Sequence, residues 1–346
     1  MDNELIKLRK KYSAISKECR KNAKLDSCIC CNKNVSSFCN SHSIPKFILK
    51  NIQKHGLVYT ANHFWELPID NGKKGIVEAG TFHIICNNCD NNIFKDYENE
   101  NNLLDFPTNR MLAEISLKNI LLEWDKKLFE IELFNKMKQI SPNNSEFLDY
   151  KIELSSLDLN GLKWDYKRTK KIIDNNLKSG YRLIFYKKLD YILPIAFQGH
   201  ICLYGDLVGN IINDIYDENP NIKMKYINIC IFPLKDSSII YIFYHKDDRN
   251  YYKFERQFNK LSLDEKLQLI SFIIINYSED FYISQNISDE LLSNPLISNI
   301  SKNTGEIFSS FLWDIPIKQD EKLKELLKYK SFPNILDEKY SIKNNI

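Results

Sequence analysis

Apolar residues recur at helical spacing over residues 111–137, the longest periodic stretch in the chain. They fall at intervals of about three and four, and no Gly or Pro interrupts them. Thr108, which follows Pro107, is a suitable N-cap residue. The pattern therefore predicts one long helix that begins after Thr108 and ends before Ser141-Pro142.

Short apolar segments of strand-like character dominate the chain after residue 146. A turn-forming Lys-Asp-Ser-Ser sequence at 235–238 separates two of them and indicates a hairpin. Ser262 and Glu265 have the spacing of a capping box, which predicts the start of another helix. Strands are predicted at residues 181–186, 191–204, 226–234 and 239–245. This mixture of elements indicates an α+β fold whose C-terminal region holds antiparallel strands.

The first part of the chain differs from the rest because it holds most of the cysteines and both Cys-x-x-Cys motifs. A helix is predicted from Leu5 to about Lys24, and glycines separate the short strand-like pieces that follow. The sequence therefore predicts three consecutive regions. They are an N-terminal helix with a small zinc module (1–105), a helical connector (106–145) and an α+β domain that recognises a substrate, partner or trigger (146–346).

The charge of the whole chain, +3 over 346 residues, does not by itself indicate a nucleic-acid partner. The first 24 residues are locally basic, with eight Lys or Arg against three Asp or Glu. Such a segment suits phosphate contacts or a solvated helix face equally well. The sequence has neither a signal peptide nor an apolar run long enough to span a bilayer, which predicts a cytoplasmic protein with no membrane partner.

Seven of the nine cysteines fall between Cys19 and Cys89, and in a reducing compartment such clustering indicates a metal site and not disulfides. Cys28 and Cys31 form one Cys-x-x-Cys pair, and Cys86 and Cys89 form a second. Each pair places two thiolates close enough to hold one tetrahedral ion, so two pairs complete a four-thiolate shell. Zinc favours these ligands, and a closed shell leaves no open position for catalysis. The predicted ion is a structural Zn²⁺.

Two alternative ligand sets remain open from the sequence alone. Cys30 competes with Cys31, because Cys-x-Cys-Cys offers two registers. Cys39-x-x-His42 is a competing pair, and binding of the zinc by His42 would exclude a catalytic role for that histidine.

The first cysteine pair, the segment Ser41-His42-Ser43-Ile44-Pro45 and the second pair with Asp90 directly after it resemble the zinc-bearing HNH endonucleases of the ββα-metal, treble-clef type. The resemblance covers residues 25–100 only. It implies that the four cysteines hold structural zinc and that His42 is the general base. It also matches Ser41 and Asp90 to the two positions that flank a catalytic Mg²⁺ or Mn²⁺ ion. The family usually has an acid where this chain has Ser41, whereas Asp90 stands where Asn is common.

The activity that the resemblance implies is hydrolysis of phosphodiester bonds in nucleic acid, with DNA favoured over RNA. An imidazole suits proton abstraction from water near neutral pH, so His42 fits the role of base. Glu98 is expected to assist, because a helix continuing from Asp90 would place it two turns further along. Chains of this organisation resemble nucleases of bacterial phage defence or of mobile elements. Residues 146–346 leave open a homo-oligomer or a protein partner.

A second hypothesis is a zinc-dependent protein that binds nucleic acid or organises an assembly without catalysis. The missing acid at position 41 is its main support. A third is an enzyme whose active site lies in the C-terminal region. His83, within the apolar run Thr-Phe-His-Ile-Ile, is interpreted as a half-buried structural residue.

Overall fold

The computed structural model describes residues 3–61, 72–214, 219, 221–297 and 319–342. The chain divides into two compact units, each built from two separate stretches. The first unit consists of Met1–Ser43 and Gly80–Lys178, and the second of Ile44–Ala79 and Ser179–Ile346. These boundaries differ from the three consecutive regions expected from the sequence, because the segment between the cysteine pairs lies largely in the second unit.

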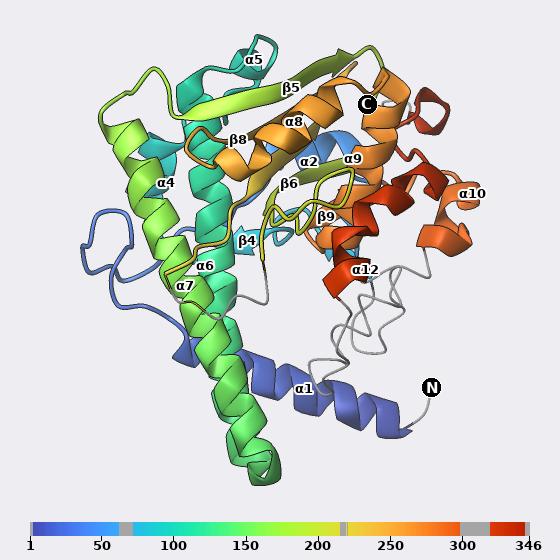
Figure 1. The fold of residues 1–346 in the computed structure, drawn as a ribbon. Coiled ribbons are helices and arrows are strands. Elements are labelled where there is room, and N and C mark those ends of the chain that lie inside the picture. Colours follow the sequence, from blue (N-terminus) through green and yellow to red (C-terminus); the bar gives the residue numbers. More distant parts are fainter. Residues whose placement is uncertain (1–2, 62–71, 215–218, 220, 298–318, 343–346) are drawn as a thin grey trace. The chain divides into compact units, whose positions relative to one another are not determined.

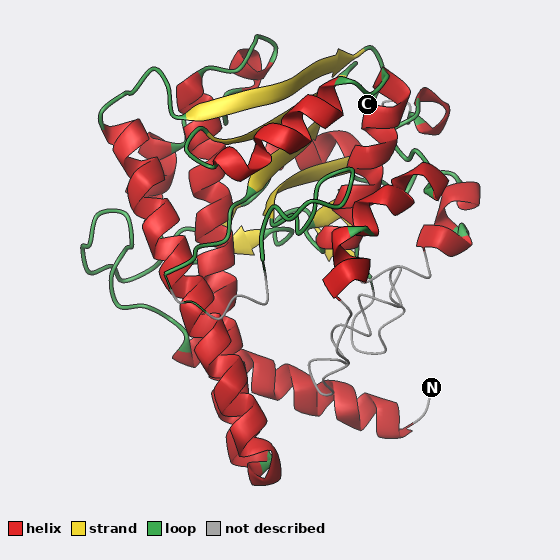
Figure 2. Cartoon of the chain, in the orientation of Figure 1, coloured by secondary structure: helices red, strands yellow, loops and turns green. Residues whose placement is uncertain are grey.

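Three long helices dominate the first unit. Helices α6 and α7 pack along each other and are joined by a short 3-10 turn, and α1 packs against α6 (Figures 1 and 2). The sulfhydryl of Cys19 in α1 donates to the carbonyl oxygen of Glu132 in α6 at 3.7 Å. The helices span Asn3–Asn22 (α1), Asn109–Ile140 (α6) and Ser145–Asp174 (α7).

Helix α6 begins where the sequence predicts, because Thr108 Oγ1 accepts a hydrogen bond from the N–H of Met111 at 3.2 Å. Every residue from Met111 to Leu122 is buried, including the polar residues Glu114 and Lys118. Burial on all sides of the helix requires these charged side chains to find partners within the protein.

The small elements of the first unit surround the cysteines. Strand β1 (Ser41–His42) pairs antiparallel with β4 (Thr81–Phe82), and helices α4 (Asn87–Ile93) and α5 (Glu100–Leu103) follow. Residues 44–79, between β1 and β4, belong to the second unit. The two ends of this segment lie close together, because Ser43 N–H donates to the carbonyl oxygen of Gly80 at 2.7 Å. Gly80 has a φ of +65°, a left-handed conformation that glycine adopts without strain.

The second unit is built on an antiparallel seven-stranded sheet with the strand order β3-β2-β9-β6-β7-β8-β5. The predicted hairpin is confirmed by β7 and β8, whereas β6 is shorter than its predicted strand. Pro194 precedes β6 and has no N–H to donate to a ladder, which limits the strand on that side. The strands are Leu57–Thr60 (β2), Lys73–Gly75 (β3), Tyr181–Leu189 (β5), Ile195–Ile201 (β6), Ile227–Pro233 (β7), Ser238–His245 (β8) and Phe281–Ile283 (β9).

Helices complete the second unit. The predicted capping box at the start of α9 is confirmed, with Ser262 Oγ accepting from Glu265 N–H and Glu265 accepting from Ser262 N–H. Side chains of α8 and α9 share one buried apolar cluster with the sheet, and Asn51 of α2 donates to the carbonyl oxygen of Pro233 in β7 at 2.9 Å. The helices are Lys46–Ile52 (α2), Tyr252–Asn259 (α8), Leu263–Tyr277 (α9), Asp289–Leu292 (α10) and Gln319–Leu323 (α12).

Candidate metal centre and adjoining polar site

The first cysteine pair lies in a tight turn that backbone hydrogen bonds close. Asn32 N–H donates to the carbonyl oxygen of Cys28 at 2.8 Å, and Cys28 N–H donates to that of Lys33 at 3.0 Å. Asn32 has a φ of +56°, a left-handed conformation that Asn tolerates better than most residues. The turn therefore brings the sulfur atoms of Cys28 and Cys31 to the same side.

The second pair is placed by the start of helix α4. Cys86 is the N-cap residue of α4, and Cys89 lies within the helix. Cys86 N–H donates to Cys28 Sγ at 3.3 Å, which links the two pairs directly. Such amide-to-sulfur bonds favour a thiolate at Cys28.

The four sulfur atoms converge on one point. Cys28, Cys31, Cys86 and Cys89 place their Sγ atoms within 4.8 Å of one another, and the Cys31 and Cys86 sulfurs are 3.9 Å apart. Burial raises the pKa of Cys28 and Cys89, whereas a hydrogen bond from the Lys33 backbone lowers that of Cys31 to about 7. A cation among the sulfurs would compensate the cost of burying thiolates, and four thiolates favour zinc. The predicted set of four cysteines is therefore positioned to bind a structural metal.

The cluster also decides between the alternative ligand sets. Cys31, and not Cys30, completes the cluster; burial raises the pKa of Cys30 to about 12, and Cys30 lies beside Tyr166. Neither Cys39 nor His42 belongs to a group of three or more clustered ligand atoms among the described residues. Cys39 instead points its sulfhydryl at Asp90 Oδ2, 3.4 Å away.

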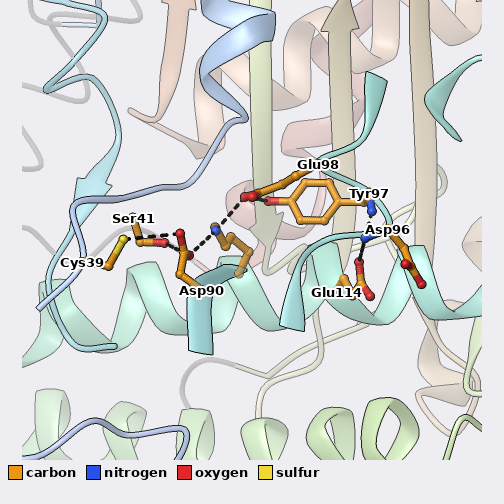
Figure 3. A network of polar contacts seen from close by, with 8 residues as sticks. Cys39, Ser41, Asp90, Asp96, Tyr97, Glu98 and Glu114 are labelled. Atoms are coloured by element: carbon orange, nitrogen blue, oxygen red, sulfur yellow. Dashed lines mark hydrogen bonds and ion pairs between the residues drawn. The ribbon is translucent and has the colours of Figure 1, made fainter. Parts of the chain in front are cut away.

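A polar network begins at Asp90, one residue after the last of the four clustered cysteines (Figure 3). Ser41 Oγ donates to Asp90 Oδ1 at 2.5 Å, so the structure brings together two of the site residues predicted from the sequence. Lys118 Nζ of α6 lies 2.7 Å from Asp90 Oδ1 and 2.7 Å from Glu98 Oε1. Burial opposes ionisation of Asp90, but Lys118 and the hydroxyl of Ser41 outweigh it and lower the pKa of Asp90.

Glu98 reaches this network from a position that the sequence did not predict. It does not lie on α4, which ends at Ile93, but in the turn that follows. The turn is held by Glu114 of α6, whose Oε2 accepts hydrogen bonds from the N–H groups of Asp96 and Tyr97 at 3.1 Å each. Residues 94–99 form a bend and turns in place of the expected second helical turn.

His42 is half-buried in β1 directly after Ser41. Side chains alternate across a strand, and Ser41 points to Asp90, so His42 faces the opposite side of β1. His83 is exposed and lies just beyond β4, so the half-buried interpretation of His83 is wrong.

Sequence reasoning missed Lys118 and Glu114. The available signal was their spacing of four within a stretch rich in apolar residues, which places two charged side chains on one face of a buried segment. Charged residues in such a run are unusual unless they are paired. Arg110, four positions before Glu114, was an identifiable partner, whereas Asp90 and Glu98, the partners of Lys118, come from other segments of the chain.

Comparisons with protein-family models, with curated proteins and with solved structures give no match for this chain. Within the described part of the chain, no helix is both long and apolar enough to cross a bilayer. The four-cysteine centre and its neighbouring polar network are therefore the features on which a functional interpretation rests.

Proposed function

We propose that the first unit is a zinc-stabilised module of the ββα treble-clef type that hydrolyses phosphodiester bonds in nucleic acid, with DNA favoured over RNA. The order β1, β4, α4 supports this proposal, because two antiparallel strands followed by a helix is the arrangement that the sequence resemblance implies. One observation carries the proposal. Ser41 and Asp90 are hydrogen-bonded at the two positions that, in the resemblance, flank a catalytic divalent ion.

The role assigned to zinc is structural. Cys28, Cys31, Cys86 and Cys89 would hold it, and four protein ligands leave no place for a substrate oxygen or water. The ion would fix the start of α4 against the first cysteine turn. Because Asp90 directly follows Cys89, the bond between Cys89 and the zinc ion would also hold Asp90 in place.

His42 is the residue to which we assign proton transfer. As a neutral imidazole it would take a proton from water as the water oxygen attacks phosphorus. The phosphorus–oxygen bond to the leaving group breaks, and that oxygen takes up a proton from solvent. The Ser41–Asp90 hydrogen bond anchors β1, the strand that carries His42.

A catalytic Mg²⁺ or Mn²⁺, which the resemblance implies, does not fit the polar network as it stands. Hard divalent ions need oxygen ligands with free lone pairs. Asp90 Oδ1 already accepts from Ser41 and Lys118, and Cys39 donates to Asp90 Oδ2. We therefore assign no chemical step to a divalent ion.

Helix α1 supplies a surface suited to nucleic-acid phosphates. Among the side chains described over residues 6–24, seven basic ones are exposed, and the exposed acid Glu18 is paired with Lys136 of α6. Binding through such side chains is expected to weaken steeply with salt. The exposed basic residues are Lys7, Lys10, Lys11, Lys17, Arg20, Lys21 and Lys24.

The second candidate is a zinc-stabilised module that binds nucleic acid without cleaving it. The ion pair between Lys118 and Asp90 favours it, because the carboxylate that the resemblance assigns to catalysis is engaged by the protein itself. Assignments to phage defence or to a mobile element, and a partner for the second unit, are proposals that follow from the resemblance alone.

Incubation of plasmid DNA and of RNA with the full-length protein distinguishes the two candidates. The assays compare wild type, His42→Ala and the matched control His83→Ala, each without divalent ions and with Mg²⁺ or Mn²⁺. Cleavage by wild type and His83→Ala but not by His42→Ala is the expected result. Equal cleavage by His42→Ala would reject His42 as the base, and salt-sensitive binding without cleavage would support the second candidate.

A further inference from the structure

The ammonium group of Lys118 lies in the centre of the polar network. Its side chain is fully buried, and it lies 2.7 Å from one oxygen of Asp90 and 2.7 Å from one oxygen of Glu98. Its Nζ also lies 4.0 Å from the centroid of the Phe94 ring. A buried lysine held by two carboxylates and an aromatic face is fixed in position and has no route to solvent.

The residues around Lys118 come from four separate parts of the first unit. Ser41 lies on β1, Asp90 on α4, Glu98 in the following turn and Lys118 on α6. Their meeting at one point is therefore a tertiary feature of the fold and not a local helix pair. The side chains of Asp90 and Glu98 remain partly exposed, at 13% and 29%, whereas that of Lys118 is not.

The charge balance explains what the lysine does there. Two carboxylates without Lys118 would present two negative charges and several oxygen ligands, the combination that Mg²⁺ and Mn²⁺ bind. The ammonium supplies one positive charge between them and occupies the shared space. A divalent ion bound to the same oxygens would lie within a few ångströms of the ammonium and be repelled by it.

We propose that Lys118 is a built-in cation that takes the place of a divalent metal ion beside Asp90 and Glu98, so that this site binds neither Mg²⁺ nor Mn²⁺. If the first unit hydrolyses phosphodiester bonds as proposed above, it does so without an added divalent ion. Lys118 then acts as a positioning residue, holding Asp90 and through it Ser41 and β1.

Titration of zinc-loaded, full-length protein with Mn²⁺, followed by calorimetry and by the electron paramagnetic resonance of free Mn²⁺, tests the proposal without reference to activity. Lys118→Met keeps the length of the side chain and removes the charge. Lys127→Met is the matched control, because Lys127 lies on the same helix and also pairs with two carboxylates, those of Glu130 and Asp158. The double variant Lys118→Met with Asp90→Asn identifies the binding site.

Wild type and Lys127→Met are expected to bind no Mn²⁺, whereas Lys118→Met gains one equivalent that Asp90→Asn abolishes. A Lys118→Met protein that folds and still binds no Mn²⁺ would overturn the proposal. So would binding of one equivalent by wild type that is lost in Asp90→Asn, a comparison that remains decisive if Lys118→Met does not fold. Absence of all nuclease activity would reject the proposed function but leave this binding result intact, whereas cleavage that requires Mg²⁺ would overturn the inference.

Discussion

Cys31 Sγ lies 3.9 Å from Cys86 Sγ, although the two residues are 55 positions apart in the chain. Between them, in the part of the segment that the structure describes, the chain contributes helix α2 and strands β2 and β3 to the second unit before it returns at Gly80. The cysteine centre therefore joins two segments that no regular helix or sheet connects, apart from the two-residue pairing of β1 with β4. An ion bound there would contribute its binding energy to the folding of the first unit.

Replacement of Cys31 by Ser should lower zinc content from one ion per chain and destabilise the first unit, because one of four ligands is lost. Structural zinc binding contributes roughly 10–16 kcal/mol in small zinc domains, so loss of one ligand is expected to be severe. Metal analysis with thermal unfolding measures both effects. Cys30→Ser is the matched control from the same turn. Loss of zinc in Cys30→Ser but not in Cys31→Ser would show that Cys30, and not Cys31, is the ligand.

Replacement of Glu114 by Gln should loosen the turn that carries Glu98. The carboxylate accepts from two backbone N–H groups and pairs with Arg110 at 2.9 Å, and Gln offers one neutral oxygen in its place. The expected loss is about 1–3 kcal/mol of the free energy of unfolding. Hydrogen exchange at Asp96 and Tyr97 should accelerate. Glu123→Gln, on the same helix but in a partly exposed pair with Lys126, should change little.

Acid should destabilise the second unit through Glu255. Burial alone would raise the pKa of Glu255, but hydrogen bonds from Arg182 at 2.6 Å and from Tyr244 at 2.5 Å outweigh it and lower that pKa below its usual 4.5. A lowered pKa in the folded state contributes stability that is present above the unfolded pKa and is lost as pH falls through the folded value.

The measurement is hydrogen exchange in β8 and α8 at a series of pH values below about 4.5. Glu255→Gln should be less stable at neutral pH and show a flatter response to acid. Glu321→Gln, which alters an exposed carboxylate in the same unit, should retain the wild-type response. An unchanged pH response in Glu255→Gln would show that other groups govern acid stability.

Replacement of residues 44–79 by a short Gly-Ser linker should affect the stability of the second unit but not the zinc content of the first. Ser43 and Gly80 are already hydrogen-bonded at 2.7 Å, so a short linker spans the gap and zinc content should stay at the wild-type level. The second unit should lose stability, because β2 and β3 form one edge of its sheet and β2 pairs with β9 through backbone hydrogen bonds. Retained stability of the second unit, measured by hydrogen exchange in β6 and β9, would contradict this expectation.

Local patterns in the sequence were sufficient for the elements whose signals are short-range. Thr108 as the cap of α6, the capping box at Ser262 and the β7–β8 hairpin follow from neighbouring residues, because caps and tight turns are formed within a few positions. The two Cys-x-x-Cys pairs likewise indicated a four-sulfur centre, although Cys30 and the Cys39/His42 pair remained alternative ligands.

The sequence by itself thus indicated the α+β class, helices α1, α6 and α9 and the two Cys-x-x-Cys pairs, since each depends on spacing along the chain, whereas it did not predict the long helix α7. Only the tertiary structure decided that Cys31 completes the centre in place of Cys30, that Glu98 leaves α4, and that Lys118 stands between two carboxylates. The physical reason is range. Burial and charge pairing depend on which distant segments meet, and one sequence without its fold does not contain that information explicitly.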